Sequence, residues 1–196
     1  MTLKSKVLFL LTSFSILTAC GSTTQTPNVP SESAATDTTT IQEADSVTVE
    51  LINADGDKIG EALLTEEQDQ VVLSISATDL PPGEHGFHIH EKGIVEPPSF
   101  ESAGDHFNPT DAEHGENSEN GPHLGDIPNL VVEEDGTVEA EFILTGVSLN
   151  PDVENSLAQP AGTSLVIHAN PDDYESQPSG DAGDRIAAGV IFEPSE

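Results

Sequence analysis

Short runs of alternating apolar and polar residues follow one another along the chain from residue 45. In the first run, one side carries Val47, Val49 and Leu51, and the other carries Thr48 and Glu50. Such alternation is typical of a β-strand with one buried face. Similar segments cover 58–64, 71–77, 84–91, 127–133, 137–144, 163–168 and 186–192, and no segment has a convincing helical period. The pattern predicts an all-β domain of eight short strands, folded as an antiparallel Greek-key β-barrel or sandwich.

Two interruptions of this pattern are longer than the turns between the other strands. Asp-Gly pairs at 55–56 and 135–136 predict tight turns, whereas 92–126 and 169–185 are long, polar segments. Long segments without regular structure inside a compact domain usually carry function. We therefore expect two functional loops.

The N-terminal residues have a different character. Two lysines precede an apolar run at 7–17, which is too short for a membrane-spanning helix of about twenty residues but fits a secretory signal peptide. The run ends in the sequence LTACG at 17–21, which resembles a bacterial lipobox. The resemblance implies that 1–19 is a lipoprotein signal peptide and that Cys20 is lipidated. An ordinary signal peptide with a chance cysteine is the alternative.

A flexible tether is expected between this anchor and the β domain. Residues 20–44 are rich in Ser, Thr and Pro and show no apolar period, which is typical of a linker. The domain then occupies 45–196. The protein is predicted to be exported and held by lipid at the outer face of a bacterial membrane. Cys20 is the only cysteine, so no intramolecular disulfide can form.

Acidic side chains far outnumber basic ones. The chain has 36 Asp and Glu residues against 5 Lys and Arg, a formal net charge of −31. Cleavage before Cys20 removes two lysines, which brings the charge to −33 and leaves Lys58, Lys92 and Arg185. Nucleic acids and anionic membrane surfaces require clustered cations, so neither is expected as a partner.

Histidines are concentrated in and beside the two long loops. In the strand at 84–91, His88 and His90 alternate with Phe87 and Ile89, so the two imidazoles share one face and can reach one ion. His85 falls on the other face, and we interpret it as a structural, hydrogen-bonded histidine.

Further candidate ligands follow along the chain. The first long loop holds His106, His114, His123 and Asp126, and His168 ends the next-to-last strand. Imidazoles with a carboxylate suit zinc or copper. The lack of thiolates in the domain argues against a zinc finger or an iron–sulfur site.

Five segments resemble motifs of the copper/zinc superoxide dismutases, in the same order along the chain. They are GFHIH at 86–90, SAGDHFNP at 102–109, GPHLGD at 121–126, LVIHA at 165–169 and GDRIAAGVI at 183–191. The resemblance spans residues 45–192 and implies the family's eight-stranded Greek-key barrel, in agreement with the strand pattern.

The resemblance implies a copper site and a zinc site that share one histidine. The implied copper ligands are His88, His90, His106 and His168, and the implied zinc ligands are His106, His114, His123 and Asp126. Asp172 takes the position of an aspartate that links a copper ligand to a zinc ligand. Arg185 would lie beside the copper and present a cationic fork to a small anion.

The implied activity is the conversion of superoxide to dioxygen and hydrogen peroxide by copper redox cycling, with a structural zinc. His106 would bridge the two metals and supply a proton. Many relatives form dimers, so the resemblance also admits a homodimer.

Two departures from the family stand out. Relatives usually tie the first long loop to the last strand by a disulfide, but Ala188 and a residue within 94–100, with Val95 preferred, take the cysteine positions here. We expect an apolar substitute that is insensitive to reductant. The 169–185 segment also has five acidic residues and no lysine, where the family often places a lysine. We therefore expect an enzyme that works best at high salt, the alternative being acidity that serves solubility alone.

Three other functions are less consistent with these residues. A copper-buffering lipoprotein would need neither the zinc set nor Arg185. A cupin-type metalloenzyme would need a nearby ligand glutamate, and Glu91 follows His90 too closely. An adhesive sandwich domain gives no reason for clustered histidines.

Overall fold

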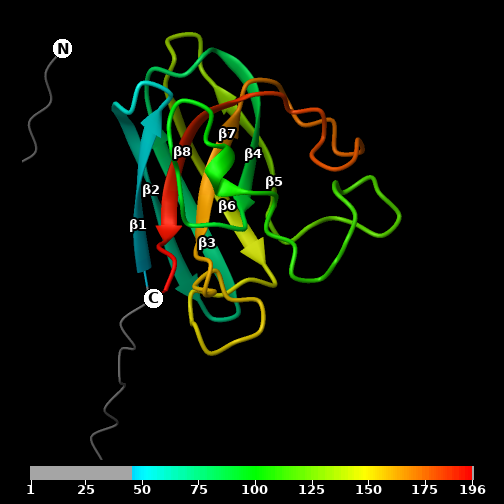
Figure 1. The fold of residues 1–196 in the computed structure, drawn as a ribbon. Coiled ribbons are helices and arrows are strands. Elements are labelled where there is room, and N and C mark those ends of the chain that lie inside the picture. The colour runs from blue at the N-terminus through cyan, green and yellow to red at the C-terminus, as the bar shows by residue number, and fades with distance from the viewer. Residues whose placement is uncertain (1–45, 196) are drawn as a thin grey trace, which may run out of the picture. The chain divides into compact units, whose positions relative to one another are not determined.

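The computed structural model describes residues 46–195 (Figure 1). The predicted signal peptide, Cys20 and the tether lie outside these described residues. Within the described part, no helix has the length and apolar character needed to cross a membrane.

Eight strands form a single antiparallel sheet that curls into a nearly closed barrel (Figure 1). The strands are β1 (Ser46–Asn53), β2 (Lys58–Glu67), β3 (Gln70–Ala77), β4 (Gly83–His90), β5 (Asp126–Val132), β6 (Val138–Thr145), β7 (Thr163–His168) and β8 (Arg185–Phe192). Their order in the sheet is β5-β4-β7-β8-β1-β2-β3-β6. The predicted all-β class and the number of strands are confirmed, and β2 runs three residues beyond its predicted end. A short 3₁₀ helix, η1 (Glu101–Ala103), was not predicted.

The alternating strands build the main core as the sequence pattern indicates. In β1, Val49 and Leu51 are fully buried while Glu50 is exposed. In β3, Val71 and Leu73 are likewise fully buried. Each such side chain contributes about 1.5–3 kcal/mol through the apolar area it removes from water. The barrel is therefore held mainly by its interior face.

Strands β4 and β7 differ because both of their faces are buried. All six residues of β7 are buried, as are residues 85–90 of β4. Phe87 and Ile89 lie in the main core, so His88 and His90 are on the opposite face. That face is covered by two long connections. We call residues 91–125 the histidine loop and residues 169–184 the acidic loop; both project from the same side of the barrel (Figure 1).

A third long connection, residues 146–162, joins β6 to β7 and was not singled out from the sequence. It is attached to β2 through Glu66, whose carboxylate accepts hydrogen bonds from Ser148 Oγ at 2.6 Å and from the Leu149 backbone N–H at 2.8 Å. It also contacts the start of the histidine loop, where Gln159 Nε2 donates to the Glu91 carbonyl at 2.9 Å and the Gly93 backbone N–H donates to the Ala161 carbonyl at 2.9 Å.

Candidate metal centre

Four imidazoles from three parts of the chain meet outside the barrel. β4 contributes His88 and His90, the histidine loop contributes His106, and β7 contributes His168. The His88 and His106 ring centroids lie 4.0 Å apart, and those of His88 and His168 lie 5.0 Å apart. A β-bridge between His90 and His106 holds the loop against β4. All four side chains are buried.

The inward-facing nitrogens of this first cluster have no hydrogen-bond partner. They are His88 Nδ1 and the Nε2 atoms of His90, His106 and His168. One nitrogen from each ring lies within 4.8 Å of those of the other three. A buried polar atom without a partner costs about 1–3 kcal/mol, so four together are unfavourable unless a cation binds them. An all-imidazole set of this kind fits copper.

The outward-facing nitrogens fix the tautomers of these rings. His90 Nδ1 donates to the Gly104 carbonyl at 2.9 Å, and His168 Nδ1 donates to the Gly183 carbonyl at 3.2 Å. Because a carbonyl only accepts, the proton lies on Nδ1 and the lone pair on Nε2. These backbone contacts aim the lone pairs into the cluster.

Burial keeps three rings of the first cluster neutral, those of His90, His106 and His168. It lowers the pKa of His90 well below 6.5. For His106, burial outweighs the opposing effect of Asp126 and lowers the pKa to about 4. For His168, burial and the neighbouring His88 lower the pKa to about 3. These rings are therefore unprotonated at neutral pH, as metal binding requires.

A second cluster surrounds Asp126 at the start of β5. Its carboxylate oxygens lie 2.9 Å from His106 Nδ1, 3.0 Å from His114 Nδ1 and 3.2 Å from His123 Nδ1. His114 Nδ1 is close to the carboxylate but is not aligned for a hydrogen bond, and it has no partner. Three imidazole nitrogens and one carboxylate oxygen fit a tetrahedral zinc ion.

Asp126 is ionised in this setting. Burial raises its pKa, but the hydrogen bonds from His106 and His123 and the close contact with His114 outweigh burial and hold the pKa well below its ordinary value. The backbone N–H groups of Gly115 and His123 also donate to it, at 2.9 and 3.0 Å. His106 belongs to both clusters, through Nδ1 here and through Nε2 in the first cluster.

Asp172, from the acidic loop, lies between the two clusters. Its Oδ2 accepts from His88 Nε2 at 2.8 Å, and its Oδ1 lies 3.0 Å from His114 Nε2. The carboxylate is buried, yet these two histidines hold its pKa below the ordinary range despite the effect of burial. The structure thus places Asp172 between one candidate copper ligand, His88, and one candidate zinc ligand, His114.

Two polar residues that the sequence did not indicate hold this arrangement. The Asn129 side-chain amide in β5 accepts from the Asp172 backbone N–H at 2.8 Å and donates to its carbonyl at 2.9 Å. The Gln177 amide pairs in the same way with the backbone of His114, at 2.9 Å for both bonds. A single amide side chain has no periodic or motif signal, so neither could be found before folding.

His85 belongs to neither cluster. Its Nδ1 lies 2.7 Å from the His168 carbonyl oxygen and its Nε2 lies 2.7 Å from the Pro81 carbonyl oxygen. Both nitrogens are engaged with the backbone, which agrees with the structural role expected from its place on β4.

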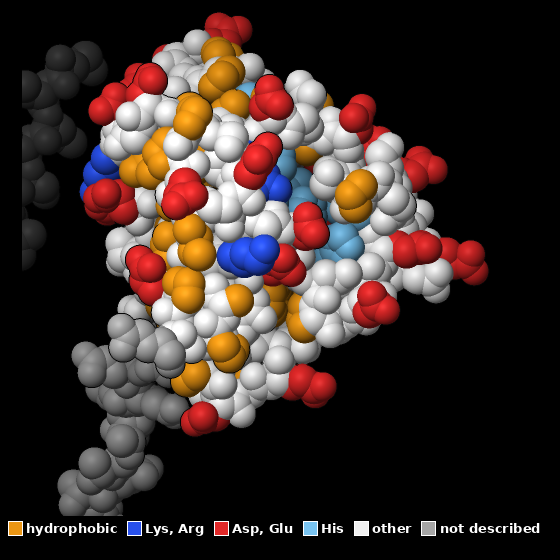
Figure 2. All heavy atoms as spheres, viewed as in Figure 1, with side chains coloured by type: hydrophobic (Ala, Val, Ile, Leu, Met, Phe, Trp, Pro, Cys, Tyr) orange, Lys and Arg blue, Asp and Glu red, His pale blue; other side chains and the backbone are white. Residues whose placement is uncertain are grey.

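Arg185, the first residue of β8, lies at the opening to the first cluster. It lines a cavity of about 430 Å³ together with His90, His106 and His168. Burial lowers the pKa of its guanidinium, but an arginine remains charged at neutral pH. Figure 2 shows histidine side chains in a hollow of the surface with acidic side chains around it. The cavity therefore combines metal-binding nitrogens with one cation.

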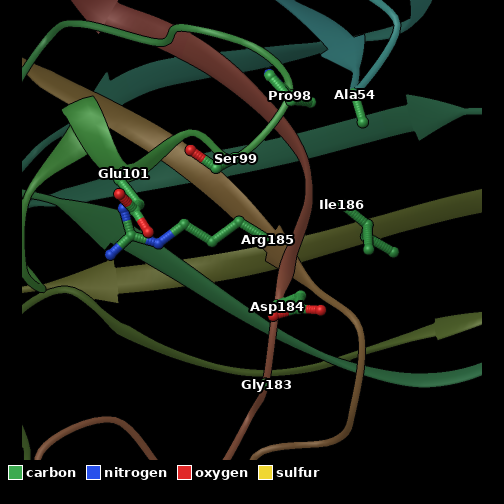
Figure 3. Close-up of a pocket in the computed structure, with 8 residues that line it drawn as sticks. All are labelled: Ala54, Pro98, Ser99, Glu101, Gly183, Asp184, Arg185 and Ile186. Carbon is green, nitrogen blue, oxygen red and sulfur yellow. The ribbon is translucent and has the colours of Figure 1, made fainter.

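Arg185 also lines a larger cavity, of about 620 Å³ (Figure 3). Pro98, Ser99 and Glu101 line it from the histidine loop. The Arg185 side chain runs from β8 toward this loop, and the Glu101 side chain lies beside its guanidinium end (Figure 3). Arg185 and Gly183 thus line both cavities.

The apolar substitute expected for the family disulfide centres on Phe100. Phe100 and Ala188 are fully buried in one small cluster, whereas Val95 is only partly buried at its margin. The preferred partner of Ala188 is therefore Phe100 and not Val95, although both lie within the range considered.

Metal-free protein is expected to release about one proton from His114 when it binds zinc. Burial lowers the pKa of His114, but the carboxylates of Asp126 and Asp172 outweigh burial and raise it to about 9. The ring is therefore protonated below pH 9 and must lose that proton to become a ligand, so apparent zinc affinity should rise about tenfold per pH unit up to that value. Calorimetry in buffers of different ionisation enthalpy measures the released proton. Zinc uptake with no released proton at pH 7 would contradict this expectation.

The fold and the site together define a β-barrel protein with two adjoining candidate metal sites that share a histidine. A family model described as copper/zinc superoxide dismutase matches residues 58–191. The chain belongs to the copper/zinc superoxide dismutase family.

Individual relatives agree with this assignment. The chain is 48% identical over 143 residues to the copper/zinc superoxide dismutase 2 of Aquifex aeolicus, covering 72% of this chain and 84% of that one. It is 37% identical over 145 residues to the copper/zinc superoxide dismutase of Escherichia coli K12, covering 69% and 80%.

Solved structures are similar as well. A superoxide dismutase-like protein from Bacillus subtilis superimposes with a TM-score of 0.71 at 40% identity, covering 74% of this chain and 97% of that one. The copper/zinc superoxide dismutase of Brucella abortus gives a TM-score of 0.61 at 28% identity, covering 75% and 99%.

Proposed function

We propose that the protein is a superoxide dismutase that converts two superoxide ions and two protons into dioxygen and hydrogen peroxide. The observation that carries this proposal is the set of four buried, unpartnered imidazole nitrogens, three of whose rings line a cavity together with Arg185. Such a set can bind a copper ion, and the arginine supplies the only cationic side chain among the lining residues.

The residues divide the work in a way that suits a small anionic substrate. His88, His90, His106 and His168 would hold copper, which supplies one-electron chemistry when bound. His106, His114, His123 and Asp126 would hold zinc.

Arg185 attracts and orients the anion, because a guanidinium presents a rigid set of N–H donors. His106 is the residue that can hold and deliver a proton at Nε2, since Nδ1 faces Asp126 at 2.9 Å. Asp172 fixes the orientation of the His88 and His114 rings, because its carboxylate contacts both.

Replacing His106 by Ala is expected to abolish superoxide consumption, with a loss of at least about 100-fold, because this change removes one ligand from each cluster. Metal analysis combined with a direct superoxide-decay assay measures the effect. Leu63→Ala, on the exposed side of β2, serves as the control and should keep both metals and full activity. A wild-type protein that binds copper but does not consume superoxide would instead indicate copper buffering.

We further propose that Cys20 anchors the mature protein by lipid at the outer face of a bacterial membrane. Support comes from the lipobox-like LTACG sequence and the apolar run before it. Cys20→Ser is expected to release the protein from the membrane fraction, with labelled fatty acid no longer incorporated. Retention of the variant in that fraction would contradict the anchor.

Sedimentation of the released protein also tests the homodimer that the family resemblance admits.

A further inference from the structure

A second, smaller core lies between the histidine loop and strands β7 and β8. Phe100, Ala103, Val166 and Ala188 are fully buried there, with Ile52 and Val95 packed against them. Val166 and Ala188 are directly paired across β7 and β8. Phe100 is by far the largest fully buried member, so its ring provides most of the apolar contact between the loop and the two strands.

The backbone of the same loop segment holds the Arg185 guanidinium. Nη1 donates to the Phe100 carbonyl at 2.7 Å, and Nη2 donates to the Gly104 carbonyl at 2.7 Å. The Gly104 carbonyl also accepts from His90 Nδ1 at 2.9 Å. One carbonyl therefore contacts both a candidate copper ligand and the substrate-facing cation.

The direction of the Phe100 carbonyl depends on an unusual backbone conformation, which the contacts of the buried ring help to hold. Phe100 adopts φ 54° and ψ 19°, a left-handed conformation that large side chains rarely adopt. Its backbone N–H donates to the backbone carbonyl of Glu96 at 3.0 Å. Such a conformation persists only where surrounding contacts stabilise it, and the buried ring supplies such contacts.

We propose that Phe100 is a positioning residue for Arg185, an inference that rests on the proposed dismutase function. Its ring, buried against β7 and β8, fixes the two carbonyls that aim the guanidinium along the opening to the first cluster. Ala188 lies three residues beyond Arg185 on β8, so the loop is attached to this strand at two nearby points, one apolar and one polar. The described domain contains no cysteine, and this attachment is entirely noncovalent.

The test compares Phe100→Ala and Phe100→Leu in copper- and zinc-loaded protein. Azide binding, followed by visible absorption, reports how well Arg185 receives a small anion without any turnover. Phe100→Ala is expected to weaken azide binding and to lower kcat/KM for superoxide by about fivefold to tenfold, with unchanged metal content. Phe100→Leu keeps a large apolar side chain in the place of the ring and should restore most of both losses.

The control is Leu73→Ala, which removes a fully buried side chain of β3 in the main core. It should lower thermal stability without changing azide affinity. In an Arg185→Ala background, Phe100→Ala should add less than a twofold further loss, because the two residues then act through one group. Additive losses, or azide affinity within twofold of wild type in Phe100→Ala, would overturn the proposal. If Phe100→Ala does not fold, Phe100→Val takes its place in the comparison with Phe100→Leu.

The outcomes separate this inference from the proposed function. A wild-type protein that does not consume superoxide would refute the dismutase activity, whereas the azide series would still decide whether Phe100 positions Arg185.

Discussion

Replacing Asp172 by Ala is expected to weaken binding of both copper and zinc by about 10- to 100-fold, the usual cost of removing a group that orients metal ligands. Asp172 contacts His88 Nε2 and His114 Nε2 at 2.8 and 3.0 Å, and one ring belongs to each cluster. Without the carboxylate, both rings lose the contact that orients them. Competition with a chelator of known affinity measures each metal separately.

The neighbouring Asp173 provides a matched control. Its carboxylate is exposed and accepts hydrogen bonds only from nearby residues of the same loop, including Ser176 Oγ at 2.6 Å. Asp173→Ala removes the same charge from the next residue of the acidic loop, but it leaves both clusters intact. Equal losses of metal affinity in Asp172→Ala and Asp173→Ala would show that charge, and not ring orientation, is responsible.

Raising the ionic strength from about 10 mM to about 150 mM is expected to increase kcat/KM for superoxide severalfold, because the Debye length falls from about 30 Å to about 8 Å. The chain carries a net charge of −31, and the cavity at the first cluster is lined by Glu91 and Asp105 as well as by Arg185. At low salt, the distant carboxylates repel an anion before Arg185 can attract it. Pulse-generated superoxide decay across a salt series measures the change.

Removing acidic groups at the opening should reproduce part of this salt effect. Glu91→Gln and Asp105→Asn are expected to raise the rate at low salt and to reduce its dependence on salt. Glu139→Gln, at an exposed position of β6 that does not line the cavity, should have a much smaller effect. A wild-type kcat/KM that falls steadily as salt increases would mean that local attraction by Arg185 dominates, and the acidity would then serve solubility.

The strands and the candidate ligands could be predicted because they depend on local order in the chain. Side chains alternate along a strand, so the spacing of His88 and His90 places them on one face wherever β4 lies in the sheet. The motif around His106 and the position of Asp172 were found from the resemblance. The third long connection was overlooked because 146–162 contains no histidine and no motif.

Contacts between distant segments could not be predicted in the same way. Asn129 and Asp172 are 43 residues apart, and Gln177 reaches the backbone of His114 across 63 residues. Each pairing depends on how two irregular loops fold over β4 and β7. Isolated amide residues leave no period or spacing from which such contacts could be inferred.

By itself, the sequence determined the eight strands, the face of β4 that carries its histidines and the types of residue available to bind metal, because alternation and motif spacing are local properties. Only the tertiary structure decided that Phe100, and not Val95, is the main apolar partner of Ala188, and that the Gly104 carbonyl contacts both His90 and Arg185. These outcomes depend on the packing of the histidine loop against the barrel, since burial and backbone direction within a loop are decided by all the surfaces that meet there.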